Sequence, residues 1–244
     1  MSELSNYIDE YLKTEYTLKS TLKDSVQSSV YLYQKNDSAK QIVKISQKNR
    51  NDHVLRRLRG QLNKNTATIY EVCSNDEDVT VLEEYISGAT LRHIVEANGG
   101  TLKRELAVKY ALDICNGLVF IHSLGIIHRD IKPSNIIITE QGEAVIIDFG
   151  IARLTDDSKY ADTKNLGTAG YAAPEQFGIY QSGPVTDIYA VGVLLNELLL
   201  GVHPTIDTPK GKLGKVINKC IMAQMSKRCL LYTSPSPRDR SLSR

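Results

Sequence analysis

Apolar and polar positions alternate in short runs over the first third of the chain. Val, Ile, Tyr and Thr are concentrated in residues 16–45 and 67–86, in segments separated by polar residues. This composition is typical of strands joined by turns. The segments are SSVYLYQ, QIVKIS, TATIYEV and VTVLEEYI. We therefore expect a small β-sheet in this part of the chain.

The apolar spacing becomes helical between these strands and again beyond the segment SGATL. One helix is predicted between the strands, where apolar residues recur every three or four positions at Val54, Leu55, Leu58 and Leu62. A long helix is predicted by the repeat of Leu106, Tyr110, Ala111, Ile114, Leu118 and Ile121. The segment VTDIYAVGVLLNELLLG predicts a second, almost wholly apolar helix. The later part of the chain is therefore expected to be mainly helical.

Composition places the chain among globular proteins. Its 244 residues are 41% apolar and 24% charged, which allows one large domain or two lobes with a substantial core. The apolar runs are too short to span a bilayer, and the N-terminal MSELSNYIDEYLK lacks the layout of a signal peptide. We therefore expect a cytoplasmic location, with any membrane anchor of the full-length protein outside this stretch.

Charge and cysteine usage argue against two other kinds of site. The net charge of +2 comes without the clustered Lys and Arg that a nucleic-acid surface needs. The four cysteines are scattered, with no His at ligand spacing, which favours a reducing compartment and no zinc site. Neither nucleic acid nor zinc is therefore expected as a partner.

The last sixteen residues, CLLYTSPSPRDRSLSR, change abruptly from an apolar helical pattern to a stretch of Ser, Pro and Arg. A disordered tail is one interpretation. The alternative is suggested by reverse translation, because residues 229–239 can be encoded by a DNA sequence that resembles the transposase end and adaptor used in sequencing libraries. We therefore expect residues 229–244 to be non-native.

A polar octet, HRDIKPSN at residues 128–135, lies between the apolar segments GLVFIHSLGII and IIIT. Short strands on both sides would make it a loop on a rigid scaffold, where catalytic groups collect. His-Arg-Asp followed by Lys132 and Asn135 resembles the catalytic loop of the eukaryotic-like, Hanks-type bacterial Ser/Thr protein kinases. Three more motifs follow in the order of that family, namely DFG, GTAGYAAPEQF and TDIYAVG.

The resemblance covers residues 16–228 and implies an α+β, bilobal protein kinase fold. Residues 16–86 would form a small, β-rich N-lobe with one helix, and residues 87–228 a larger, mainly helical and incomplete C-lobe. Residues 1–15 would be an N-terminal extension. Such kinases transfer the γ-phosphoryl group of ATP to a protein hydroxyl with the help of Mg²⁺.

The resemblance also implies catalytic roles. Asp130 would accept or orient the proton of the attacking hydroxyl, and Lys132, which in this family accompanies Ser/Thr acceptors, would approach the γ-phosphate. Asn135 and Asp148 would hold Mg²⁺ against the phosphates. Thr168 would help to place the substrate. By the same resemblance, the residues between DFG and Ala173-Pro174-Glu175 would form the activation segment, and its phosphosite candidates are Thr155, Ser158 and Thr163.

An ATP site is implied between the lobes, with Lys44 of QIVKIS matching the phosphate-contacting lysine and Ile42 lying over the adenine ring. Tyr85 and Ile86 would present the hinge backbone. Lys44 is also counted with the catalytic residues. The predicted ATP-contacting residues are Lys23, Ser25, Ser28, Val30, Ile42, Lys44, Glu83, Glu84, Tyr85, Ile86, Ile137 and Asp148.

The chain departs from the family pattern around this ATP site. Lys23, Ser25 and Ser28 stand where three glycines are expected, and their side chains should reshape the cradle around the phosphates. The helix glutamate that should pair with Lys44 is missing, and Arg57 falls near its position. Lys23 is a candidate for supplying charge in the altered loop.

Glu83 would lie at the back of the pocket, just before the hinge. Because a buried, unpaired carboxylate is costly, we hypothesise that Glu83 pairs with Lys44 in place of the missing helix glutamate. The alternative is that Glu83 turns outward at the strand edge. Elsewhere, Arg228 resembles the arginine that pairs with the glutamate at the end of the activation segment, here Glu175. By the same resemblance, His128 would pack on Phe149. His93, His122 and His203 have no partner that the sequence identifies.

Three functions remain open at this point. The first is an active Ser/Thr protein kinase with a protein substrate and self-association for autophosphorylation. The second is a pseudokinase that acts as a binding or scaffold module, suggested by the glycine-free loop and the absent helix glutamate. The third is a small-molecule kinase. The segment GTAGYAAPEQ disfavours it, because this segment resembles those of kinases that act on proteins. The retained Asp130, Asn135 and Asp148 favour catalysis.

Overall fold

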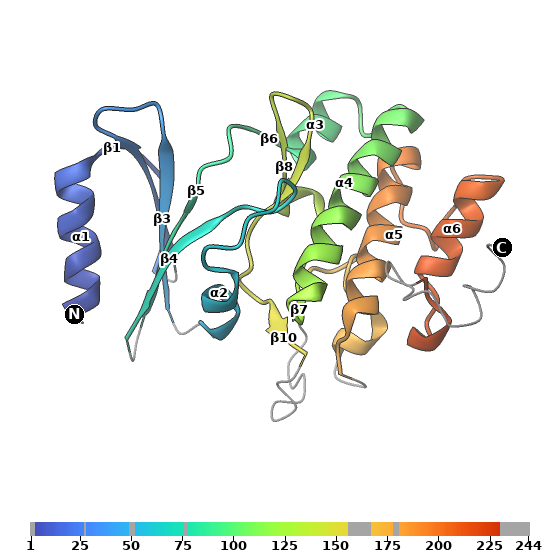
Figure 1. Ribbon diagram of the computed structural model, residues 1–244. Helices are drawn as coiled ribbons and strands as arrows, with labels where there is room; N and C mark the ends of the chain where they lie inside the picture. Colours follow the sequence, from blue (N-terminus) through green and yellow to red (C-terminus); the bar gives the residue numbers. More distant parts are fainter. Residues whose placement is uncertain are drawn as a thin grey trace, which may run out of the picture.

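The computed structural model describes residues 3–26, 28–48, 52–75, 78–155, 167–177 and 181–229 and has two lobes (Figure 1). The N-lobe is built on a five-stranded antiparallel sheet with the strand order β1-β2-β3-β5-β4. The strands are β1 (Tyr16–Asp24), β2 (Ser28–Lys35), β3 (Gln41–Lys48), β4 (Ile69–Ser74) and β5 (Asp78–Glu84). The predicted sheet is confirmed.

Two helices accompany this sheet, α1 (Glu3–Glu15) and α2 (His53–Leu58). The N-terminal helix α1 lies against the sheet on the side away from the C-lobe (Figure 1). Its Ile8 and Leu12 are buried in a small core with Ile42 of β3 and Leu82 of β5. Residues 1–15, predicted only as an extension, therefore contribute a helix to the N-lobe, which has two helices where one was expected.

The interrupting helix α2 is shorter than the apolar spacing predicted. Val54, Leu55 and Leu58 are buried as expected, but Leu62 lies beyond the helix and is 77% exposed. The chain leaves the helix at Arg59 and turns at Gly60, whose φ of 74° is a conformation that glycine adopts easily. This turn overrides the helical periodicity.

The C-lobe is mainly helical, as predicted. Its long helices α4 and α5 pack together, and α6 packs on α5 (Figure 1). The helices are α3 (Leu91–Ala97), α4 (Arg104–Ser123), α5 (Pro184–Leu200) and α6 (Lys212–Cys220). The short strands are β6 (Gly88–Thr90), β7 (Ile126–Ile127), β8 (Ile136–Thr139), β9 (Ala144–Ile146) and β10 (Arg153–Leu154), and the 3-10 turns are η1 (Pro133–Asn135), η2 (Pro174–Phe177) and η3 (Met225–Lys227).

One apolar core joins the two lobes. It runs from α2 and β4 of the N-lobe to α4 and α5, and its members include Leu55, Ile69, Ile114 and Leu194. Among the helices that the structure describes, none combines the length and the apolar character needed to cross a membrane. Residues 230–244 lie outside the described part of the chain, so the non-native tail stays a prediction.

Candidate functional site

The catalytic-loop motif, residues 128–135, connects β7 to β8 and is anchored by one buried carboxylate. Asp187, in the first turn of α5, accepts hydrogen bonds from the backbone N–H of His128 at 2.9 Å and of Arg129 at 2.8 Å. Arg129 has a φ of 67°, which is uncommon for a residue other than glycine. The two backbone hydrogen bonds stabilise this strained conformation, and the loop is thereby held in one shape.

His122 also belongs to this anchor, although the sequence identified no partner for it. Its Nε2 lies 2.8 Å from Oδ2 of Asp187. The two residues are on different helices, α4 and α5, and are 65 positions apart in the sequence. No local pattern could have shown this contact.

His128 is fully buried and has a structural role, as the family resemblance implied. Its ring packs on Phe149 with 5.2 Å between the ring centres. Burial lowers its pKa, so the ring is neutral. Nδ1 lies 3.3 Å from the backbone N–H of Asp130 and must be the acceptor there, which leaves Nε2 to donate to the carbonyl of Ile147 at 3.3 Å. The histidine thus connects the catalytic loop to the DFG segment.

Asp130 lies at the centre of a cluster of polar side chains. Its Oδ1 accepts a hydrogen bond from the Thr168 hydroxyl at 2.8 Å, and its Oδ2 lies 2.7 Å from Nζ of Lys132 and 2.9 Å from Nδ2 of Asn135. Burial alone would raise the pKa of Asp130, but the hydrogen bonds from Lys132, Thr168 and Asn135 outweigh it and lower that pKa. The carboxylate is therefore ionised at neutral pH and is held in place by several donors.

Asp148 follows β9 and has the second left-handed backbone among the non-glycine residues that the structure describes, with a φ of 61°. Its Oδ1 accepts a hydrogen bond from the N–H of Gly150 at 3.0 Å. Asp148 lines a cavity of about 620 Å³ between the lobes, a size typical of small-molecule sites. The strained backbone directs the carboxylate to this cavity.

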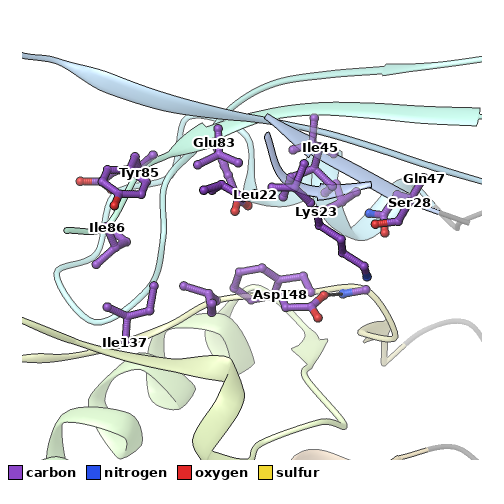
Figure 2. A pocket seen from close by; sticks show the side chains of 18 of the residues that line it. Leu22, Lys23, Ser28, Ile45, Gln47, Glu83, Tyr85, Ile86, Ile137 and Asp148 are labelled. Atoms are coloured by element: carbon purple, nitrogen blue, oxygen red, sulfur yellow. Dashed lines mark hydrogen bonds between the residues drawn. The ribbon is translucent and has the colours of Figure 1, made fainter. Parts of the chain in front are cut away.

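The cavity contains most of the predicted ATP-contacting residues (Figure 2). Ten of the twelve line it, namely Lys23, Ser25, Ser28, Val30, Glu83, Glu84, Tyr85, Ile86, Ile137 and Asp148. The sequence missed further lining residues, which are Leu22, Val43, Ile45, Gln47, Leu55, Val81, Ile147, Phe149 and Gly150. Ile42 and Lys44 are not in the lining.

Comparison with known proteins identifies the architecture. The family described as "Protein kinase domain" matches residues 14–244. The chain belongs to the protein kinase family. The two lobes, the cavity between them and the ordered loop motifs of this kinase domain agree with that membership.

The kinase domain is similar to several named relatives. It is 35% identical over 162 residues, 63% of the chain, to a probable serine/threonine-protein kinase of Clostridium perfringens. It is 42% identical over 127 residues, 51% of the chain, to the probable serine/threonine-protein kinase PknB of Bifidobacterium longum. The matched region covers only 24% and 18% of those two proteins. A plant relative, calmodulin-binding receptor-like cytoplasmic kinase 2 of Arabidopsis thaliana, is 39% identical over 153 residues, 59% of this chain and 37% of its own.

Two predicted ATP contacts of the kinase domain are wrong, because β3 presents its other face to the cavity. In the sheet, Val43 lies opposite Glu83 and Ile45 opposite Val81, and all four line the cavity. Successive side chains of a strand point to opposite faces, so Lys44 points away from the cavity. Its Nζ lies 2.5 Å from Oδ1 of Asp9 in α1.

Ile42 is displaced for the same reason. It is buried against α1 on the outer face of the sheet and does not lie over an adenine site. A shift of one residue in the alignment of β3 exchanges every side chain between the two faces. The lysine of QIVKIS therefore matches the family motif in sequence but not in orientation.

The predicted ion pair between Glu83 and Lys44 is also wrong. Glu83 neither reaches Lys44 nor turns outward, since it lines the cavity (Figure 2). Burial, and after it the negative charges of Asp148 and Glu84, raise the pKa of Glu83 to about 8. At neutral pH this side chain is therefore mostly a neutral acid that can donate a hydrogen bond.

The contact between β3 and α2 is apolar in this kinase domain. Active kinases place a Lys–Glu ion pair there. Here Ile45 and Leu55 both line the cavity and belong to the same apolar core. Arg57, predicted near the glutamate position, instead donates from Nη1 to the carbonyl of Leu124 at 3.2 Å. Between α2 and β3, apolar packing of Leu55 and Ile45 therefore stands where the ion pair would be.

The predicted pair between Glu175 and Arg228 is present. The Arg228 guanidinium donates to both carboxylate oxygens of Glu175, at 2.5 and 2.8 Å. The side chain of Glu175 is 1% exposed and that of Arg228 is 0% exposed. Thr186 adds a hydrogen bond to Glu175 at 2.8 Å. Burial by itself would raise the pKa of Glu175, but the hydrogen bonds from Arg228 and Thr186 lower it. The pair joins the end of the activation segment to the last described part of the C-lobe.

Proposed function

We propose that this protein is a Ser/Thr protein kinase that transfers the γ-phosphoryl group of ATP to a protein hydroxyl. The observation that carries the proposal is the hydrogen bond from the Thr168 hydroxyl to Asp130, next to the ammonium group of Lys132. A hydroxyl of the Ser/Thr type already lies on this carboxylate, so an acceptor hydroxyl can be recognised in the same way. The relatives named as serine/threonine-protein kinases support the same reaction class.

In the proposed step, the acceptor oxygen forms a bond to the γ-phosphorus while the bond from that phosphorus to the β,γ-bridging oxygen breaks. The electron pair of the broken bond leaves with ADP, and the hydroxyl proton passes to the Asp130 carboxylate. Lys132 neutralises charge on the transferring group. Because Lys132, Thr168 and Asn135 hold Asp130, the base needs little rearrangement during the reaction.

Asn135 and Asp148 would hold the Mg²⁺ ion that accompanies ATP. A carboxylate and an amide oxygen are the hard oxygen donors that this ion prefers. The structured part of the chain contains no group of three or more His, Cys, Asp or Glu side chains able to hold a metal. A site with the two protein ligands Asn135 and Asp148 fits Mg²⁺, because this ion is bound by few protein ligands together with phosphates and water. The ion would neutralise charge on the phosphates.

The test is phosphate transfer from Mg-ATP by the full-length protein, to itself and to a generic Ser/Thr acceptor. Asp130→Asn is the matched control, because asparagine keeps the shape of the side chain but cannot take the proton. We expect transfer by the wild type, phosphoserine or phosphothreonine in the product, and loss of transfer in the variant. Equal transfer by both proteins would contradict the role of Asp130.

A pseudokinase that binds partners without phosphoryl transfer is the second candidate. The orientation of Lys44 toward Asp9 favours it, since the cavity-facing positions of β3 carry Val43, Ile45 and Gln47. A folded full-length protein that shows no transfer with either Mg²⁺ or Mn²⁺ would favour this candidate. We likewise propose protein substrates, self-association and a cytoplasmic location. The four free cysteines suit that location, because the cytosol keeps thiols reduced.

A further inference from the structure

The orientation of β3 leaves the cavity without the cation that a kinase normally supplies from this strand. Val43, Ile45 and Gln47 face the cavity, and none of them carries a positive charge. Lys44 lies on the other face with Asp9. Lys132 supplies positive charge from the C-lobe side, but the phosphates of a nucleotide carry several negative charges, and charge-assisted contacts to them are strong. A cation on the N-lobe side of the cavity would therefore strengthen their binding.

Lys23 is the only Lys or Arg among the described residues that line the cavity. Figure 2 shows its side chain extending from β1 across the cavity toward the segment that carries Asp148. No salt bridge joins Lys23 to another residue within the described ranges. Its ammonium group is therefore available for an anionic ligand located between β1 and Asp148.

A local irregularity of β1 explains how Lys23 comes to face the cavity. Leu22 and Lys23 are neighbours, yet both line it, which a regular strand does not allow because successive side chains alternate. The pairing of β1 with β2 shifts register between Thr21 and Lys23. A β-bulge of this kind redirects side chains and is frequent next to active sites. Leu22 thus adds an apolar wall and Lys23 adds a charge.

The turn between β1 and β2 gives a second reason to expect a side-chain cation. The backbone N–H of Ser25 donates to the carbonyl of Ser28 at 3.0 Å, and the N–H of Ser28 donates back to the carbonyl of Ser25 at 3.3 Å. The Ser25 hydroxyl donates to the same Ser28 carbonyl at 2.9 Å. These two N–H groups are already used within the turn, so they are not open to phosphate as the amides of a glycine-rich loop are.

We propose that Lys23 contacts the phosphates of the bound nucleotide and takes the place of the β3 lysine. The proposal rests on the proposed function, since it assumes that the cavity binds ATP. Lys23 then approaches the phosphates from the N-lobe side, while Asp148 faces them from the C-lobe side. The bulged β1 strand and the glycine-free turn become parts of one altered phosphate site.

The first test is nucleotide binding by the full-length protein, measured by titration calorimetry with a non-hydrolysable ATP analogue and Mg²⁺. Adenosine, which has no phosphates, is titrated in parallel. Lys23→Met should weaken binding of the analogue about 10- to 100-fold, the range expected for one charge-assisted hydrogen bond, and leave adenosine binding unchanged. Lys19→Met, on an exposed position of the same strand, is the matched control and should bind both ligands like the wild type.

A relocation variant makes the test sharper. Adding Ile45→Lys to Lys23→Met returns a cation to the cavity-facing side of β3, and this double variant should regain much of the lost affinity for the analogue. Lys23→Arg should also retain binding. Unchanged affinity of Lys23→Met for the analogue would overturn the role of Lys23 alone. A wild-type protein that binds neither ligand would overturn the proposed ATP-dependent function as well, so the two failures are distinguishable.

Discussion

Lys44 of β3 and Asp9 of α1 form an ion pair, with Nζ 2.5 Å from Oδ1, on the face of the N-lobe sheet that is turned away from the cavity. The lysine that matches the kinase motif in sequence thus secures a helix and does not contact the cavity. Ile8 and Leu12 of the same helix pack against this face. Helix α1 therefore covers the outer side of the sheet and forms a small apolar core with it.

Lys44→Met should leave phosphoryl transfer largely intact, because Lys44 does not line the cavity. The variant should lose less than about 1 kcal/mol of unfolding free energy, as expected for a partly exposed ion pair. Urea unfolding and transfer assays would be run on the same preparation, with Lys13→Met of α1 as the control. Loss of transfer in a stable Lys44→Met protein would contradict the outward orientation.

Leu12→Ala should destabilise the protein by about 2–5 kcal/mol, the cost of removing a large buried side chain from a packed core. Leu12 is 1% exposed between α1 and the sheet. Leu18→Ala, at an exposed position of β1, serves as the control in urea unfolding. A loss for Leu12→Ala no larger than that of the control would show that α1 does not pack on the sheet in solution.

Glu83 should make the stability of the protein fall as the pH rises. Its pKa is about 8 in the folded protein, against an ordinary value of 4.5, so between these values the folded state binds more protons than the unfolded state. Stability therefore decreases as pH rises from about 4.5 through about 8. Glu83→Gln should remove this contribution and melt at a higher temperature than the wild type at pH 8.5.

The measurement is a series of thermal melts from pH 5.5 to 9, with Glu105→Gln, an exposed position, as the control. The difference between Glu83→Gln and the wild type should grow toward high pH and stay flat for the control. A constant difference across this range would mean that the carboxyl of Glu83 does not titrate within it.

Arg228→Ala should destabilise the protein by about 3–5 kcal/mol, because it leaves the buried Glu175 carboxylate without its cation. Replacing both partners, as in Glu175→Gln with Arg228→Met, should recover part of the loss, since no charge then stays buried. Urea unfolding at pH 7 would compare the three proteins. An Arg228→Ala variant as stable as the wild type would argue against the bidentate pair.

Thr168→Ala should lower kcat about 100-fold at most, with a smaller change in KM, because Thr168 positions Asp130 and Lys132. Thr168→Ser retains the hydroxyl and should restore most of the rate. Steady-state kinetics with saturating ATP would separate the two parameters. Equal rates for the alanine and serine variants would show that the hydroxyl has no positioning role.

Much of the C-lobe could be predicted because its signals are local. The 3.6-residue apolar period predicted α4, and an almost wholly apolar run predicted α5. The octet HRDIKPSN placed Asp130, Lys132 and Asn135 on one loop, where the structure has Lys132 and Asn135 in contact with Asp130. Contacts between distant segments could not be predicted in this way. His122 and Asp187 are the example, since neither residue has a neighbour in sequence that reveals the other.

The sequence by itself therefore determined the fold class, the long helices and the composition of the catalytic loop. The tertiary structure decided which face of β3 meets the cavity. Both faces of this strand carry apolar residues, Ile42 on one and Val43 with Ile45 on the other, so its pattern alone does not fix the orientation. The packing of α1 on one face and the register of β3 with β5 fix the choice, and with it the displacement of Lys44 and the place of Lys23 in the cavity.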